Sequence, residues 1–185
     1  MKNIIILFFL SLSVSVLSQD TEMLGYINQY RSVHGKSNLM ISKTLTNLAE
    51  NQLSIIVLQN KLSHTKMDTG VVSEICNMGT SLPTTLDVES KFINFLKVNF
   101  NIVYVEPKND VEVVKYVKLY IIYLFDSSPS HKVILLGIHK FVGFSYSIDK
   151  IKYAPNYIEL MGEKHYWKNI ISHYNVDFYS VVVFN

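Results

Sequence analysis

The chain contains very little cysteine: Cys76 is the only one among its 185 residues. Because a disulfide needs two cysteines, no internal disulfide framework can stabilise this fold. Ile75 and Met78 flank the cysteine, so we expect a buried thiol that packs as a small hydrophobic side chain. The hydrophobic core itself must therefore supply the stability of the domain.

The chain also lacks an excess of either charge. Its 17 basic and 15 acidic residues are dispersed and give a formal net charge of +2. No basic tract occurs, which argues against a nucleic-acid partner. Hydrophobic residues make up 49% and charged residues 17%, a composition typical of a globular protein. A length of 185 residues predicts one domain with a sizeable core.

After the first twenty residues, the sequence has no apolar run long enough to span a bilayer. Those first residues have the layout of a secretory signal peptide: Lys2, the apolar run Ile4–Leu10, and then Ser18 before polar residues. An uncleaved membrane anchor is the alternative, although residues 4–17 fall short of the roughly 20 that a span requires. We therefore expect a signal peptide over residues 1–18 and a secreted, extracellular domain over residues 19–185.

Apolar residues recur at helical spacing through the first two thirds of the chain. Cap and stop residues mark several boundaries, such as Ser42 before the second helix and Gly35 after the first. Five helices are predicted: residues 20–34, residues 42–60, a third around Phe92 and Phe95, a fourth opening at Asn109, and a short one over residues 129–136.

The last third of the chain instead has the alternating and β-branched patterns of strands. The strand candidates are residues 141–148, 156–161 and 177–184, with an earlier one at residues 101–105. Helices lead and strands follow without βαβ alternation, and no internal repeat occurs. The predicted fold class is therefore α+β with a mostly antiparallel sheet.

Three polar residues are candidates for a functional site. His64 follows the second helix, Glu74 comes ten residues later, and His131 lies in the first turn of the short helix. Two imidazoles and one carboxylate form a ligand set suited to Zn²⁺, so a divalent metal held by these three residues is one hypothesis. No His-x-x-x-His pair is present to fix two such ligands on one helix.

The order of the motifs resembles the CAP superfamily, also called the SCP domain, which includes cysteine-rich secretory proteins, venom allergens and plant pathogenesis-related proteins. The resemblance covers most of residues 20–185. The segments that carry it are Asn28–Arg31 with Gly35, the helix through Leu45 and Ala49 ending in Ser63-His64-Thr65, Ser128–Lys132 with Ile134-Leu135, Phe141–Tyr146, and Phe178–Phe184.

The resemblance implies a secreted, three-layer α-β-α sandwich with a cleft lined by two histidines and two acidic residues. His64 and His131 match the two histidines. Glu74 matches the glutamate of the family's Gly-Glu-Asn motif, although its neighbours here are Ser73 and Ile75. Tyr123 stands where the second acidic residue is expected, so the chain resembles a divergent member that has kept one of the two acids.

The resemblance also implies a choice of functions. Several members hold a divalent metal in the cleft, and others bind sterols or lipids. We expect a non-enzymatic domain without catalytic residues that binds an extracellular protein, a lipid or a sterol through a cleft of His64, Glu74, His131 and Tyr123. A metal-dependent hydrolase using the same cleft is the alternative, but no serine lies in a Gly-x-Ser-x-Gly elbow.

Overall fold

The computed structural model describes residues 21–64, 73–81, 86–153, 157–160, 163–166 and 174–185. The predicted signal peptide, residues 1–18, lies outside these ranges. A first helix over residues 21–33 opens the described chain. The elements that follow are β1 (Met40–Ile41), α2 (Lys43–Gln59), β2 (Ser73–Ser81), α3 (Leu86–Phe100), α4 (Asp110–Ser127), α5 (Pro129–Leu135), β3 (Phe141–Tyr153), β4 (Tyr157–Leu160), β5 (Glu163–Tyr166) and β6 (Tyr174–Phe184).

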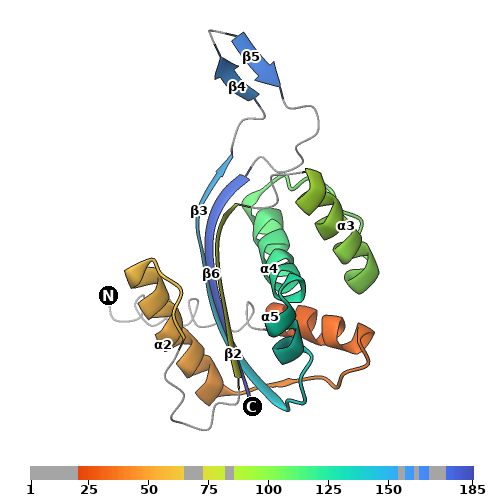
Figure 1. Cartoon of the computed structure of the whole chain (residues 1–185), viewed down its shortest axis with the longest axis vertical. Helices are drawn as coiled ribbons and strands as arrows, with labels where there is room; N and C mark the ends of the chain where they lie inside the picture. Colours follow the sequence, from red (N-terminus) through yellow and green to blue (C-terminus); the bar gives the residue numbers. More distant parts are fainter. Residues whose placement is uncertain (1–20, 65–72, 82–85, 154–156, 161–162, 167–173) are drawn as a thin grey trace, which may run out of the picture.

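The main sheet has four strands in the order β1-β3-β6-β2. β6 pairs antiparallel with both β3 and β2, and only the two-residue β1 runs parallel to its neighbour. β4 and β5 form a separate antiparallel pair that extends beyond the far ends of β3 and β6 (Figure 1). The predicted class, α+β with a mostly antiparallel sheet, is therefore confirmed.

Helices cover both faces of the main sheet. α2 lies against one face, while α3, α4 and α5 lie on the other side (Figure 1). Side chains alternate along β6 in agreement with this: Val181 and Val183 pack with α2, whereas Val182 and Phe184 pack with α4. On the neighbouring β2, Cys76 packs on the α2 face and Ile75 on the opposite face. Glu74 is two residues from Cys76 and so belongs to the α2 face.

The close approach of α2 to the sheet depends on Gly143 of β3. A Cβ atom at this position would lie 2.1 Å from the carbonyl carbon of Leu45 and from the amide nitrogen of Thr46. Both atoms are backbone in the first turn of α2, where the Ser42 side chain caps the helix as predicted. Only glycine allows the strand and the helix to touch here.

The guanidinium group of Arg31 is one of the largest fully buried groups in the protein. It donates hydrogen bonds to the carbonyl oxygens of Ser37 (3.0 Å), Leu135 (2.6 Å) and Gly137 (3.2 Å). The last two carbonyls lie at the end of α5, where a positive charge is favourable. Arg31 thus ties the first helix to the end of α5 across about a hundred residues of sequence.

The strand predicted at residues 101–105 is not formed. Asn101 has a φ of 53°, which ends α3, and the next residues run without a paired strand. Buried and exposed side chains do alternate along this segment, since Ile102 and Tyr104 pack on the core while Val103 and Val105 are exposed. The hydroxyl of Tyr116 accepts the backbone N–H of Val105 and takes the place of a strand partner.

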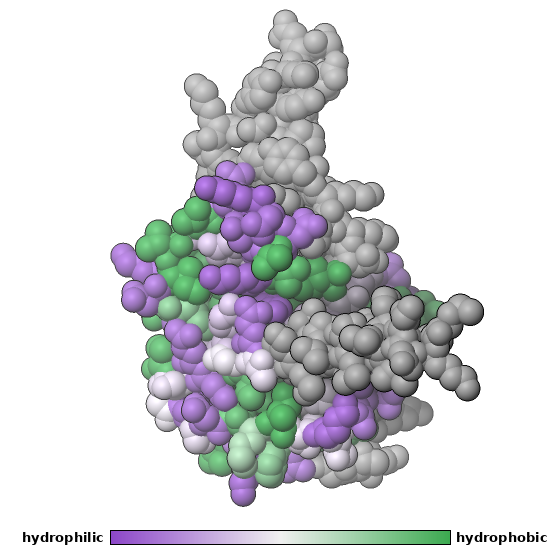
Figure 2. Space-filling model, turned by 180° about the vertical axis from the view of Figure 1, so that it is seen from behind, coloured by the Kyte–Doolittle hydropathy of each residue, from purple (hydrophilic) through white to green (hydrophobic). Residues whose placement is uncertain are grey.

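Apolar side chains are also scattered over the surface. On the face seen in Figure 2, hydrophobic patches alternate with hydrophilic ones over the coloured part of the molecule. Leu58 and Ile138 are the most exposed of the large hydrophobic residues. Among the described residues, none of the helices combines the length and the apolar character that a membrane crossing requires.

Candidate metal-binding site

His64 reaches the site from the end of α2. The helix stops at Asn60, whose left-handed φ of 47° turns the chain back toward the sheet. The buried side chain of Gln52 then fixes the returning segment, because its Nε2 donates to both the carbonyl oxygen and the hydroxyl of Ser63. The residue after Ser63 is His64, so Gln52 sets the position from which the imidazole extends.

Glu74 and Cys76 reach the site from the edge strand β2. They are two residues apart, so their side chains leave the strand on the same face. The side chain of Glu74 is 1% exposed, whereas that of His64 is 60% exposed. The site thus consists of a buried carboxylate and a buried thiol under a histidine that solvent can reach.

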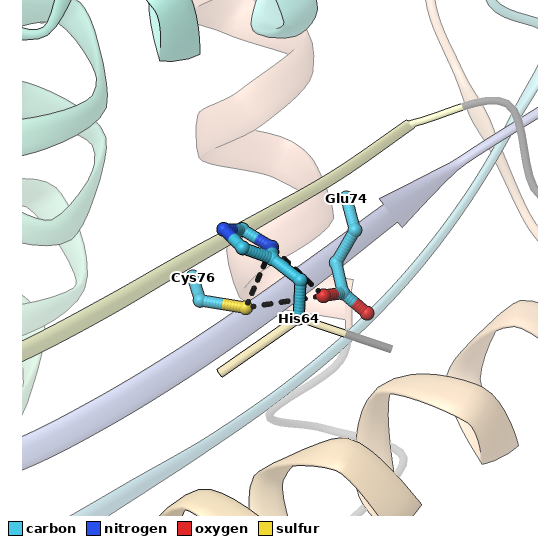
Figure 3. Close-up of side chains that lie close together, drawn as sticks. All are labelled: His64, Glu74 and Cys76. Atoms are coloured by element: carbon cyan, nitrogen blue, oxygen red, sulfur yellow. Dashed lines mark hydrogen bonds and ion pairs between the residues drawn. The ribbon is translucent and has the colours of Figure 1, made fainter. Parts of the chain in front are cut away.

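The three side chains meet in a compact triangle (Figure 3). His64 Nδ1 lies 3.1 Å from Glu74 Oε1, and Cys76 Sγ lies 3.4 Å from the same oxygen. The third side, between Cys76 Sγ and His64 Nδ1, measures 3.9 Å. The other ring nitrogen of His64 lies on the side of the ring away from Glu74 (Figure 3). We call these three residues the His64–Glu74–Cys76 triangle.

The electrostatic environment keeps the thiol of Cys76 protonated in the absence of a cation. Burial raises its pKa, and the negative charge and hydrogen bond of Glu74 raise it further. The sulfur is therefore a donor to the Glu74 carboxylate and not an activated nucleophile. A bound cation would reverse this preference, because a thiol that coordinates a metal loses its proton.

The dimensions of the triangle fit a tetrahedral metal ion. Zinc bonds of about 2.0–2.3 Å to N, O and S ligands, at tetrahedral angles, place neighbouring ligand atoms about 3.4–3.6 Å apart. The observed separations of 3.1, 3.4 and 3.9 Å bracket this range. Imidazole, carboxylate and thiolate are also the three ligand types that proteins use for zinc. The donor set therefore suits such an ion.

His131 is not part of this triangle. It lies on α5, which packs on the opposite side of the sheet from α2 (Figure 1), and its ring contacts Phe125 edge to face with 5.8 Å between centroids. Burial, and in second place the positive charge of His64, lower the pKa of His131. The structure thus brings together His64 and Glu74, two of the three metal ligands expected from the sequence. The third side chain beside them is Cys76 and not His131.

Tyr123 also lies elsewhere. Its ring packs against Phe92, Phe95 and Tyr120 between α3 and α4, so aromatic packing accounts for its burial. Tyr123 also lines an open groove of about 310 Å³. The residues that line this groove include Lys91, Asn94, Phe95, Asn99, Tyr123 and Asp126. The lining thus combines charged and amide side chains with the apolar surfaces of Phe95, Val98 and Tyr123.

No known protein family, no curated protein and no solved structure matches this chain. The resemblance to the CAP superfamily rests on the order of its motifs and stays a prediction.

Sequence reasoning missed the roles of Cys76 and Gln52. The sequence does contain a signal for Cys76: Glu74 and Cys76 are separated by one residue, which places both on one face if the segment is a strand. No strand was predicted for residues 73–81, where Asn77 and Gly79 interrupt the β-branched pattern. Gln52 belongs to the buried stripe of α2, and a polar residue within an apolar stripe indicates an internal hydrogen bond.

Proposed function

We propose that the chain is a secreted, divergent CAP-type domain that acts by binding, at a divalent metal site formed by His64 and Glu74. The observation that carries this proposal is the pairing of a buried carboxylate with a solvent-accessible imidazole at 3.1 Å. These two residues come from different elements, and the resemblance had placed both in one cleft. Helices on both faces of a mostly antiparallel sheet also support the proposed α-β-α sandwich.

The contacts of the nearby serines favour binding over hydrolysis. The hydroxyl of Ser63 accepts a hydrogen bond from Gln52 (3.0 Å), and the hydroxyls of Ser128 and Ser130 contact each other (3.3 Å). Neither arrangement presents a serine to an imidazole base, as a nucleophile would require. Metal binding without turnover is therefore the function that we put forward.

Calorimetric titration of Zn²⁺ into the domain from residue 19 onward tests this proposal. We expect one ion per chain, and we expect His64→Ala and Glu74→Gln each to reduce the affinity by more than about 100-fold, because each removes a direct ligand. His34→Gln is the matched control, since the His34 ring binds the Tyr30 carbonyl and lies outside the triangle. Equal Zn²⁺ affinity in all four proteins would contradict a site at His64 and Glu74.

A further inference from the structure

The third corner of the His64–Glu74–Cys76 triangle identifies the kind of cation that the site accepts. Cys76 is 5% exposed, and its sulfur lies within reach of both partner atoms, 3.4 Å from Glu74 Oε1 and 3.9 Å from His64 Nδ1. The three ligand atoms all lie within 4.8 Å of one another, and the described residues contain no second cluster of this kind. A metal ion bound by His64 and Glu74 would thus sit beside the sulfur.

Charge balance favours a thiolate at this position. A divalent ion bound by one carboxylate and one imidazole keeps a net charge of +1 in a largely buried site, which is costly. Coordination by Cys76 releases the thiol proton to solvent and brings the sum of +2, −1 and −1 to zero. Metal coordination through His64 Nδ1 requires the neutral ring to carry its proton on Nε2, which lies on the side of the ring away from Glu74 (Figure 3).

We propose that Cys76 is the third metal ligand and that the site therefore selects thiophilic divalent cations such as Zn²⁺ and Co²⁺ over Mg²⁺ and Ca²⁺. This inference rests on the metal binding proposed above for His64 and Glu74. Hard cations prefer oxygen ligands, and the triangle offers only one carboxylate to them. His131, which the sequence had suggested as the third ligand, is not required.

Absorption spectroscopy with Co²⁺ tests this directly on the unmodified protein. A thiolate bound to Co²⁺ gives a charge-transfer band in the near ultraviolet, and this band can come from no other residue, because the chain has a single cysteine. We expect the band to appear at one equivalent of Co²⁺ and to disappear when one equivalent of Zn²⁺ is added. A large excess of Mg²⁺ or Ca²⁺ should leave it unchanged.

Two substitutions separate Cys76 from His131 as the third ligand. Cys76→Ser should abolish the band and weaken Co²⁺ binding by more than the 10- to 100-fold typical of an outer-shell residue. His131→Ala should keep the band, since its ring lies outside the triangle. Loss of Co²⁺ binding in His131→Ala together with unchanged binding in Cys76→Ser would overturn the inference.

The outcomes distinguish the inference from the function on which it rests. Calorimetric binding of Co²⁺ without a charge-transfer band would overturn the role of Cys76 and leave the His64–Glu74 site standing. Absence of Co²⁺ and Zn²⁺ binding to the wild-type domain would overturn both. Because these readouts use the wild-type chain, they remain decisive even if Cys76→Ser does not fold.

Discussion

At the scale of single residues, Gln52 lies outside the His64–Glu74–Cys76 triangle but holds the segment that carries His64. Its amide holds Ser63, and Ser63 in turn fixes the start of the His64 side chain. We expect Gln52→Leu to weaken Zn²⁺ binding by about 10- to 100-fold, because outer-shell residues orient the ligands. Calorimetry measures this effect, and the apo protein should keep a cooperative thermal transition.

The matched control for this prediction is Asn51→Leu, which alters the exposed neighbour of Gln52 on the same helix. Its Zn²⁺ affinity should equal that of the wild type. If Gln52→Leu also binds Zn²⁺ with wild-type affinity, Gln52 has no positioning role.

A second residue-scale effect concerns His139 and pH. Its Nε2 donates to the Ile134 carbonyl (2.9 Å), and its buried Nδ1 has no hydrogen-bond partner among the described residues. Burial in the first place, and also the nearby charge of Arg31, lower its pKa below 6.5 and outweigh the hydrogen bond to Ile134, which raises it. The neutral ring is thus the form that the fold requires.

The unfolded chain therefore binds more protons than the folded chain just below pH 6.5. Stability should be complete above this pH and should decrease as the pH falls through the lower, folded pKa. Urea unfolding over this pH range measures the effect. His139→Gln keeps a donor for Ile134 but cannot titrate, so its stability should vary less with pH than that of the wild type. An equal pH dependence in both proteins would contradict this account.

At the scale of secondary-structure elements, the contact between α2 and β3 leaves no room for a Cβ atom at Gly143. Gly143→Ala would place a methyl group against the backbone of Leu45 and Thr46, which cannot move aside as a flexible side chain would. We expect a loss of about 1–3 kcal/mol in the free energy of unfolding, measured by urea denaturation, as for other overpacked sites.

Gly25→Ala is the control for this change. Gly25 lies inside the first helix, and an added Cβ would meet no atom within 4 Å. Alanine should therefore stabilise the helix by up to about 1 kcal/mol. If both alanine substitutions stabilise the protein, the close approach at Gly143 does not constrain the fold.

The elements also show how much of the structure the sequence could predict. Local signals sufficed for the helices: Ser42 and Asn109 cap α2 and α4 as expected, and Gly35 ends the first helix with a φ of 68°. Strands need partners far away in sequence, which local patterns do not reveal. Side chains alternate along residues 101–105, but no strand pairs with this segment. Residues 73–81 pair with β6 although their β-strand sequence pattern is weak.

The candidate site follows the same division. The order of the motifs along the chain was enough to predict that His64 and Glu74 lie in one cleft. The sequence interpretation assigned His131 to the third position and read Cys76 as a buried core thiol, because the correct choice depends on which face of the sheet each element covers. That depends on the pairing of β2 with β6 and on the packing of α2 and α5 on opposite sides.

At the scale of the whole molecule, Arg31 connects elements that are far apart in sequence. Arg31→Met would keep much of the buried volume but leave three carbonyl oxygens without their donor. We expect a loss of about 3 kcal/mol in the free energy of unfolding, measured by urea denaturation. Arg31→Lys should recover only part of it, because an ammonium group cannot match the planar fork. Wild-type stability of Arg31→Met would show that these bonds contribute nothing.

The proposed route of the protein out of the cell is also a property of the whole chain. Expressed with its first 18 residues in a cell with a secretory pathway, the chain should appear in the medium with Gln19 as its first residue. Mass spectrometry of the secreted product measures this. Ile6→Asp, which interrupts the apolar run, should keep the protein inside the cell. An intact residue 1 on the extracellular protein would contradict cleavage after Ser18.

The central place of β6 in the sheet has a consequence for the order of folding. β6 is the last of the described elements to leave the ribosome, yet β2 and β3 do not pair with each other and each pairs with β6. Its side chains also pack on both faces of the sheet, with α2 on one face and with α4 on the other. The nascent chain therefore cannot close its sheet until residue 184 has been made, and such long-range pairing folds slowly. The nascent chain therefore stays unfolded for most of its synthesis. A polypeptide must be unfolded in this way to pass through a translocation channel.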